Sequence, residues 1–227
     1  MGGIYGEHPC YWAETGFGKS PAAFRREIAI VDIETTGFDA RKHSIIDVAI
    51  GIVDIKTMEL SSTWESKIAL LPGELDAANK ESLKIVGYNE SEWASAPARG
   101  TVMHEAAQRL HGRAIVGHNI TFDLAFLDFN FRMLGINGVF DGIELSMVDT
   151  MQLARMFLGP LGMTSFSLHN CLQALGLETE GHHRALGGVM ACHRLLKHLV
   201  DASGSVISKG LIVKEAPKRK SKKKEES

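Results

Sequence analysis

Cysteine is scarce in this chain. The 227 residues contain three cysteines, Cys10, Cys171 and Cys192, at wide spacing and without a C-x-x-C pair. Structural zinc sites and redox-active dithiols use closely spaced cysteines, so the sequence gives no signal for either. We expect reduced thiols that are mostly buried, because free cysteine is among the most buried residue types.

Long hydrophobic runs and an N-terminal leader pattern are also lacking. Apolar segments such as residues 45–53 are too short to span a bilayer, and the first residues lack a basic region followed by an apolar one. With 44% hydrophobic and 23% charged residues, the composition is typical of soluble globular proteins. We expect a cytoplasmic protein without membrane contact, built from one well-packed domain with short appendages.

A net positive charge is found only at the end of the chain. The net charge is −2, but residues 214–227 hold seven basic and three acidic residues, so the rest carries −6. A body this acidic is not a general DNA-coating surface, and nucleic acid would be held locally by metal ions and a few placed groups. The Lys-rich end is expected to be disordered, and it fits either a solvated tail or a nonspecific phosphate contact.

The hydrophobic periodicity changes along the chain from strand-like to helical. Residues 27–33, 44–55 and 61–70 predict three strands in an antiparallel meander. Helical patterns follow at 76–85, 101–110, 121–134, 150–157, 166–175 and 185–200, with short strands at 114–116 and 145–148. This order favours an α/β structure with a mixed sheet. The predicted organisation is an N-terminal extension (1–26), one domain (27–202) and the Lys-rich tail (203–227).

Two carboxylates lie near the end of the first predicted strand. Asp32 and Glu34 are two residues apart in Ile-Val-Asp-Ile-Glu-Thr-Thr-Gly (30–37), so both leave the same face of a sheet. Each raises the pKa of the other, because two nearby negative charges repel each other. A bound divalent cation removes the energetic cost of this repulsion. Oxygen ligands without a His/Cys cluster suit Mg²⁺ or Mn²⁺ better than zinc. The alternative interpretation of this pair alone is a solvated strand end.

A third carboxylate follows the short predicted strand at 114–116. Gly117-His118-Asn119 ends this strand, and Asp123 falls in the first turn of the next helix, near its positive end. The turn Thr35-Thr36-Gly37 provides hydroxyls, free N–H groups and a glycine, which together can approach a phosphate or sugar closely. Taken alone, Asp123 is more often a first-turn charge than a metal ligand.

These segments resemble a known family. Ile-Val-Asp-Ile-Glu-Thr-Thr-Gly, Val-Gly-His-Asn-x-x-Phe-Asp (116–123) and His-Arg-Ala-Leu (183–186) look like the three motifs of the DnaQ-like DEDDh 3′-to-5′ exonucleases. This superfamily includes the proofreading epsilon subunit of bacterial DNA polymerase III and ribonuclease T. The resemblance covers roughly residues 27–200. It implies a ribonuclease H-like mixed five-stranded sheet flanked by helices, and Mg²⁺-dependent release of nucleotides from single-stranded 3′ ends, DNA in preference to RNA.

The resemblance also implies roles for individual residues. Asp32, Glu34, Asp123 and a fourth Asp would hold two Mg²⁺ or Mn²⁺ ions, about 3.5 to 4 Å apart in such sites. His183, which the motif register selects over His182, would be the general base. The expected substrate contacts are Thr35, Thr36, Phe38, His118, Asn119 and Phe122. Phe122 also lies on the apolar stripe of its helix, so core packing is an equal alternative for it.

The fourth motif carboxylate is missing. Five residues after His183, where the family has its last Asp, this chain has Gly188, and no Asp or Glu occurs between residues 181 and 200. Glycine disfavours a helix by about 1 kcal/mol relative to alanine, so folding gains nothing from it. We expect the chain to fold and to bind 3′ ends with greatly reduced exonuclease activity. Engineered inactivation and natural loss would both leave this sequence.

Two other functions stay open at the level of the sequence. The first is a catalytically inactive nucleic-acid-binding module of the same fold, which Gly188 favours. The second is an RNA 3′ exonuclease, because no residue shows how the site treats a 2′-hydroxyl. The sequence contains no segment that we can identify as docking to a polymerase or clamp, so a proofreading role is not implied, and protein partners stay unknown.

Overall fold

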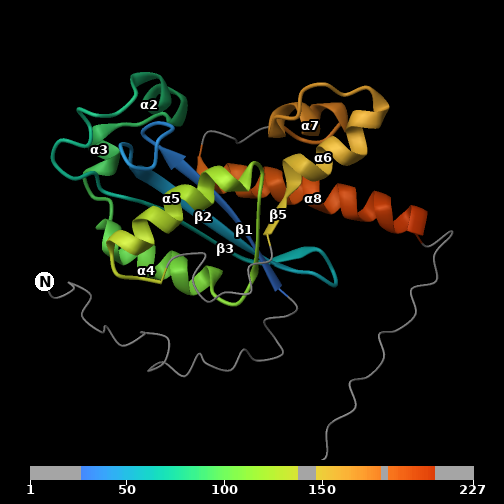
Figure 1. Ribbon diagram of the computed structural model, residues 1–227, viewed down its shortest axis with the longest axis horizontal. Helices are drawn as coiled ribbons and strands as arrows, with labels where there is room; N and C mark the ends of the chain where they lie inside the picture. The colour runs from blue at the N-terminus through green and yellow to red at the C-terminus, as the bar shows by residue number, and fades with distance from the viewer. Residues whose placement is uncertain (1–26, 138–146, 180–183, 208–227) are drawn as a thin grey trace, which may run out of the picture.

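The fold is a mixed five-stranded sheet with helices on both faces (Figure 1). A computed structural model describes residues 27–137, 147–179 and 184–207. The predicted extension (1–26) and most of the predicted tail lie outside these residues. The strand order is β3-β2-β1-β4-β5, which places β1 (Glu27–Thr35) at the centre. The predicted α/β fold class with a mixed sheet is confirmed.

The antiparallel half of the sheet is the predicted meander. β1 pairs with β2 (Ile45–Asp54), and β2 pairs with β3 (Glu59–Lys67), both antiparallel. On the other side β4 (Ala114–Gly117) runs parallel to β1, and β5 (Met147–Asp149) runs parallel to β4. The carboxyl ends of β1, β4 and β5 therefore meet at one edge of the sheet, where ligands of open α/β sheets commonly bind.

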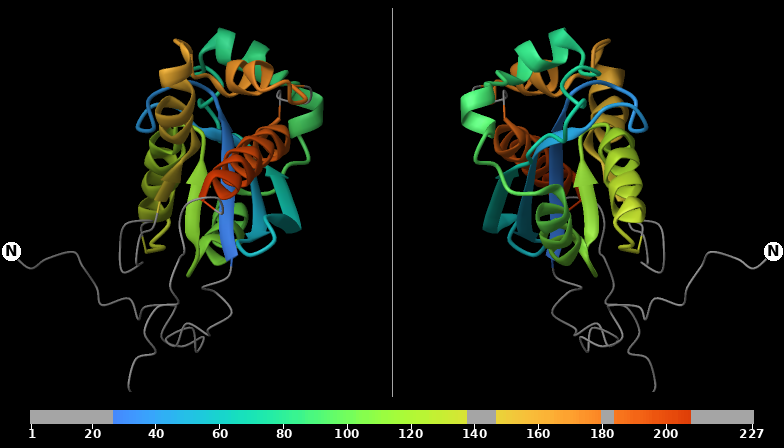
Figure 2. Two further views of the ribbon diagram at one scale, coloured as in Figure 1. Left: turned by 90° about the vertical axis from the view of Figure 1, so that its right-hand side faces the viewer. Right: turned by 90° about the vertical axis from the view of Figure 1, so that its left-hand side faces the viewer.

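Helices cover the two faces unequally. α4 (Arg99–Leu110) and α5 (Ile120–Met133) pack on one face, and α8 (Ala185–Ile207) packs on the other (Figure 2). α6 (Thr150–Leu158), the 3-10 turn η2 (Gly159–Leu161) and α7 (Leu168–Ala174) form a small lobe, in which α6 and α7 pack against α8. No helix in these described ranges is long and apolar enough to cross a membrane.

Two short helices, α2 (Lys80–Val86) and α3 (Glu90–Trp93), cover the end of the meander. The sequence pattern predicts a helix from residue 76, but α2 starts after Asn79, whose side chain accepts hydrogen bonds from the N–H groups of Glu81 and Ser82. An N-cap of this kind satisfies N–H groups that have no partner within the helix. The short α3 was not predicted.

The direction of each β1 side chain follows from strand alternation. Ala29, Val31 and Ile33 lie in the core beneath α4 and α5, whereas Ile28 and Ile30 lie in the core beneath α8. Burial of a large aliphatic side chain stabilises the fold by about 1.5 to 3 kcal/mol, so a shift of register would be costly. The same alternation directs Asp32 and Glu34 towards the α8 side of the sheet.

Glycine lets α8 approach the sheet closely. A Cβ on Gly51 of β2 would lie 2.7 Å from Val189 Cγ1 of α8 and 2.9 Å from Leu60 Cδ2 of β3. These distances are shorter than van der Waals contact, so any larger residue at 51 would displace its neighbours. The close packing of α8 on the sheet thus depends on a glycine, without a side chain, at position 51 of β2.

Candidate active site

Three of the predicted carboxylates meet at the edge where β1 and β4 end. Asp32 and Glu34 are half-buried on β1, and Asp123, in the first turn of α5, is 5% exposed. The backbone N–H of Ile33 donates to Asp123 Oδ1 at 3.1 Å. Since Ile33 lies between the two strand carboxylates, this bond joins the start of α5 directly to the acidic segment of β1.

Burial and neighbouring carboxylates raise the pKa of all three groups. Burial, followed by the charges of Asp123 and Glu34, raises the pKa of Asp32 well above its ordinary value. Burial and then Asp47 raise the pKa of Glu34 to about 7, against the opposing effect of Arg184. Burial is also the largest cause that raises the pKa of Asp123, to about 8. A cation bound among these groups would favour their charged forms.

The donor set fits a hard divalent cation, because every predicted ligand is a carboxylate oxygen. As the side chains lie, however, no group of three His, Cys, Asp or Glu residues within the described ranges encloses an ion. The types of ligand thus suit an oxygen-ligated metal, while the arrangement of the described side chains is not that of a closed metal site.

Gly188, in the buried first part of α8, lies directly against Asp32. A Cβ at position 188 would overlap the Asp32 carboxylate and would lie 2.5 Å from its Cγ. The three atoms nearest to this Cβ position all belong to Asp32. The place predicted for the fourth carboxylate is therefore next to the first, and any side chain at 188 requires Asp32 to turn away.

An arginine fixes the beginning of α8 to the sheet. Arg184 Nε donates to Asp47 Oδ2 at 2.7 Å, and Asp47 is fully buried on β2, directly opposite Glu34 in the ladder. Two like charges opposite each other on a sheet are unfavourable, so the guanidinium offsets this repulsion. The backbone N–H of Leu186 donates to Glu65 Oε1 of β3 at 3.2 Å, a second link between α8 and the meander.

The arginine network was not identified from the sequence. Arg184 belongs to His-Arg-Ala-Leu, a segment that indicated His183 as the motif histidine but gave no role to the arginine. Asp47 lies in an apolar strand. A charged residue inside such a strand is the signal that could have revealed the pair, because a buried carboxylate needs a partner.

The sequence matches a known family over most of its length. A family model, RNase_T, described as exonuclease, matches residues 29–196. The chain belongs to this exonuclease family. Members of the family generally use divalent metal ions, in agreement with the carboxylates at the sheet edge. The predicted membership of the DnaQ-like 3′-to-5′ exonucleases is confirmed.

Curated relatives of this exonuclease domain are much longer proteins. DNA polymerase III PolC-type of Caldanaerobacter subterraneus is 28% identical over 170 residues, which are 74% of this chain and 11% of that protein. The PolC-type polymerase of Bacillus cereus is 28% identical over 182 residues, 80% of this chain and 12% of that protein. The chain thus spans about a tenth of the length of these relatives.

Solved structures share the fold at low sequence identity. The zinc-bound complex of Escherichia coli ExoI with single-stranded DNA has a TM-score of 0.70 and 17% identity, covering 81% of this chain and 42% of that one. Product-bound exonuclease I has a TM-score of 0.68, also at 17% identity, with 81% and 45% covered. These likenesses confirm the predicted ribonuclease H-like exonuclease fold.

The hydroxyls of the first exonuclease motif support its turn. Thr35 Oγ1 donates to the carbonyl of Gly37 at 2.7 Å, and Thr36 Oγ1 accepts from the N–H of Ser44 at 2.9 Å. Both threonines are buried. Phe38, at the tip of this turn, is 77% exposed. Of the three substrate contacts predicted here, Phe38 is the side chain directed to solvent; all three assignments remain predictions.

The second exonuclease motif is tied to its surroundings through His118. Its Nε2 donates to the carbonyl of Phe166 at 2.8 Å, and its Nδ1 lies 3.0 Å from Thr150 Oγ1 of α6. Burial lowers the pKa of His118, which favours the neutral ring. Both ring nitrogens thus have protein partners, and His118 joins the end of β4 to the α6–α7 lobe. Its predicted substrate contact remains a prediction.

The other predicted contacts of this motif differ in exposure. Asn119 is exposed, has a left-handed backbone (φ 67°), and its N–H donates to Asp149 Oδ1 at 3.1 Å. Phe122 packs on Phe126 with ring centroids 5.0 Å apart and joins the core beneath α5. The core packing expected as an alternative for Phe122 is present. The predicted general base His183, with His182, lies outside the described residues.

Proposed function

We propose that this chain is a divalent-metal-dependent 3′-to-5′ exonuclease domain for single-stranded DNA ends, in which Gly188 reduces hydrolysis but leaves binding in place. The observation that carries the proposal is the meeting of Asp32, Glu34 and Asp123 at one sheet edge, with Gly188 directly beside Asp32.

Asp32, Glu34 and Asp123 would hold the metal, Mg²⁺ or Mn²⁺. A bound divalent ion supplies a water of lowered pKa and stabilises negative charge on the reacting phosphate. Asp123 keeps one oxygen on the Ile33 N–H, which fixes its orientation relative to the strand carboxylates. His183 would accept the proton of the attacking water as the bond between phosphorus and the 3′ oxygen breaks.

The reduction in rate follows from the missing oxygen ligand. Loss of an outer partner of a metal ligand costs roughly 10 to 100-fold in affinity or activity, and loss of a ligand itself should cost at least as much. Nothing in the first-motif turn or at the start of α5 depends on a side chain at 188, so substrate binding should survive.

A single strand is the proposed substrate for two reasons, of which the first favours DNA. The solved neighbours include complexes with single-stranded DNA, dT13 and dA16 oligonucleotides. In this chain the exposed aromatic Phe38 lies beside the first motif, and stacking of a base on an aromatic ring contributes about 1 to 3 kcal/mol.

The test compares the chain as given with Gly188→Asp and Gly188→Ala on a labelled single-stranded DNA oligonucleotide with Mg²⁺. Gly188→Asp should raise the rate by about tenfold or more, because it restores an oxygen ligand. Gly188→Ala is the matched control, since it displaces Asp32 without supplying an oxygen, and it should give no increase. Equal rates for the chain as given and Gly188→Asp would overturn the proposed impairment.

The second candidate function is a binding module without catalysis, and Gly188 is the observation that favours it. This candidate is supported over a slow enzyme if two results are obtained. The unchanged chain binds the oligonucleotide, and any residual cleavage is the same in the Asp123→Asn variant. An RNA oligonucleotide of the same sequence, run in parallel, decides between the DNA and RNA substrates.

A further inference from the structure

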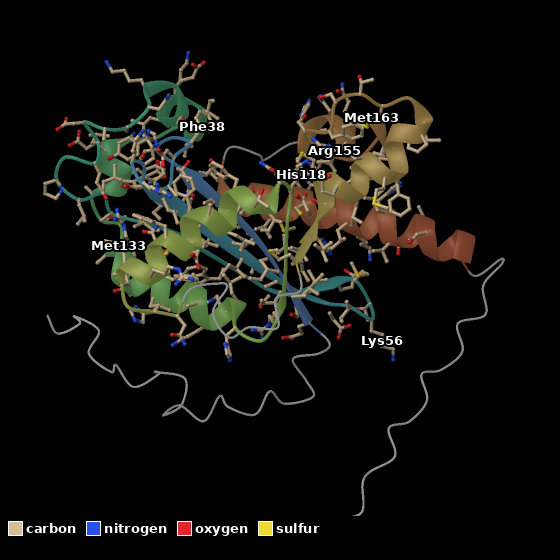
Figure 3. All side chains as sticks on the ribbon, in the orientation of Figure 1. Phe38, Lys56, His118, Met133, Arg155 and Met163 are labelled. Atoms are coloured by element: carbon tan, nitrogen blue, oxygen red, sulfur yellow. The ribbon has the colours of Figure 1, made fainter. Side chains whose placement is uncertain are left out.

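Arg155, in the second turn of α6, is an exposed cation beside the site. Its guanidinium carbon lies 5.8 Å from the centroid of the Phe166 ring, and its Nη1 lies 3.4 Å from Gln152 Oε1. The carbonyl of Phe166 accepts from His118, so Arg155 lies over the ring of a residue that is fixed to the end of β4. Figure 3 shows Arg155 next to His118, on the opposite side of the site edge from Phe38.

Most other arginines of the described ranges neutralise a carboxylate. Those in ion pairs are Arg99, Arg109, Arg113, Arg132, Arg184 and Arg194. Arg155 has no ion pair with any carboxylate in the described part of the chain, and its side-chain contacts are the neutral amide and the ring. No carboxylate of these ranges therefore offsets its charge.

The location of this charge suits a phosphate. α6 starts where β5 ends, at the same sheet edge as the carboxylates, and side chains of a helix tilt towards its N-terminus. Asp149, which precedes α6, raises the pKa of Asp123, and both Asp149 and Arg155 act on the pKa of His118. Arg155 thus lies on the helix that starts at the site edge, over the ring of the residue whose carbonyl binds His118.

A positive charge near the acidic site would help the site to bind a nucleic acid. Three carboxylates repel the backbone of a nucleic acid, and the strand that leaves a 3′ end bound there must pass over the neighbouring surface. An arginine offers a planar fork of N–H donors that matches a phosphate, and a stacked guanidinium loses less conformational freedom on binding. We propose that Arg155 contacts a backbone phosphate of the single strand close to its bound 3′ end. This inference rests on the proposed function.

The experiment measures binding of a 5′-labelled oligothymidylate with a phosphorothioate 3′-terminal linkage, in Mg²⁺ and at several salt concentrations. Arg155→Gln should lower the affinity about tenfold, as expected for a charge-assisted hydrogen bond. It should also make the dependence of log affinity on log salt shallower by about 0.7, the value for one phosphate contact on a single strand. Arg155→Lys, which keeps the charge, should retain most of the slope.

Lys56 provides the matched control. It is exposed at the turn between β2 and β3, far from Arg155 in Figure 3, and Lys56→Gln removes the same charge. This variant should bind within twofold of the unchanged chain. Equal losses in both variants would show a general charge effect and overturn the inference. If the unchanged chain binds and Arg155→Gln binds equally well, the inference alone fails. If the unchanged chain does not bind, the proposed function fails with it.

Discussion

At the scale of the residue, the polar and aromatic groups of the first exonuclease motif differ in role. The hydroxyls support the turn, and the aromatic ring is exposed for contact with a ligand. The hydroxyls of Thr35 and Thr36 hold the turn, and Gly37 is needed there because a Cβ would lie 2.5 Å from Nε2 of His43. Phe38 is left exposed at the tip. An exposed aromatic on a tightly hydrogen-bonded turn loses little freedom when it stacks on a base.

Phe38→Ala should therefore weaken binding of single-stranded DNA by about 1 to 3 kcal/mol, the range for one stacked base. The melting temperature should stay unchanged, because the ring packs on little protein. Met133→Ala is a suitable control: Met133 is 71% exposed at the far end of α5 (Figure 3). Fluorescence anisotropy and thermal melts measure both properties. Equal binding by the Phe38 and Met133 variants would exclude a stacking role for Phe38.

At the scale of the element, α8 is positioned by one ion-pair network and by close packing on glycine. Arg184 is 35% exposed while its partner Asp47 is fully buried, so loss of the arginine would leave an uncompensated charge in the core of the meander. The guanidinium also lies 5.4 Å from the ring centroid of Trp93 in α3. Its Nη2 lies 3.8 Å from Glu65 Oε1 of β3, so three elements, β2, β3 and α3, meet at this side chain just before α8.

Arg184→Gln should lower the free energy of unfolding by about 2 kcal/mol. This is less than the 3 to 5 kcal/mol for a fully buried pair, because water screens the partly exposed arginine. The double variant with Asp47→Asn should recover part of the loss. Lys42→Gln, which breaks the exposed ion pair with Asp39, should change stability by less than about 0.5 kcal/mol. Urea denaturation measures all three, and an equal effect at positions 42 and 184 would contradict the argument.

Substitution by alanine at two glycines should change the stability of the protein in opposite directions. Gly51→Ala should destabilise the protein by about 1 to 3 kcal/mol, because its Cβ would press on Val189 and Leu60. A Cβ on Gly204, in the last turns of α8, meets no atom within 4 Å. Gly204→Ala should therefore stabilise the helix, by up to about 1 kcal/mol. A stabilising effect of Gly51→Ala, measured by the same denaturation, would show that α8 does not need this close approach.

Local pattern was sufficient to predict most of the elements and the shared face of Asp32 and Glu34, but not the contacts between elements. Strand alternation placed Asp32 and Glu34 on one face, and the β1 packing agrees with it. The contact of Asp32 with Gly188 depends on a side-chain rotamer and on the depth of α8, neither of which periodicity encodes. The bond between Arg184 and Asp47 joins residues 137 apart, and a four-residue helix such as α3 is too short for a periodic signal.

At the scale of the whole molecule, the site couples stability to pH. The pKa of Glu34 rises from 4.5 to about 7, and that of Asp123 from 3.8 to about 8. Because the folded state binds these protons more tightly than the unfolded state, the stabilisation is fully present below the unfolded pKa values. It is lost as pH rises through 7 and 8. A divalent cation bound to the ionised carboxylates should restore it.

The metal-free protein should therefore have a melting temperature that falls between pH 5 and pH 8.5, and Mg²⁺ or Mn²⁺ should raise it more at pH 8 than at pH 5. Asp123→Asn keeps an acceptor for the Ile33 N–H, and it should flatten both dependences. The lowered pKa of His118 acts in the opposite sense, so the difference between the chain and the variant is the relevant quantity. Parallel curves for the two proteins would disprove the linkage.

The glycine at position 188 also determines how many base changes separate this chain from one with four carboxylates in the site. Two of the glycine codons become aspartate codons by a single change at the second base. The nearest atoms to a side chain at 188 belong to Asp32, which can turn about its own side-chain bonds. From either of those two codons, an aspartate at 188 would require one base change and one rotation of the Asp32 side chain. A single point mutation would then place a fourth carboxylate beside the other three.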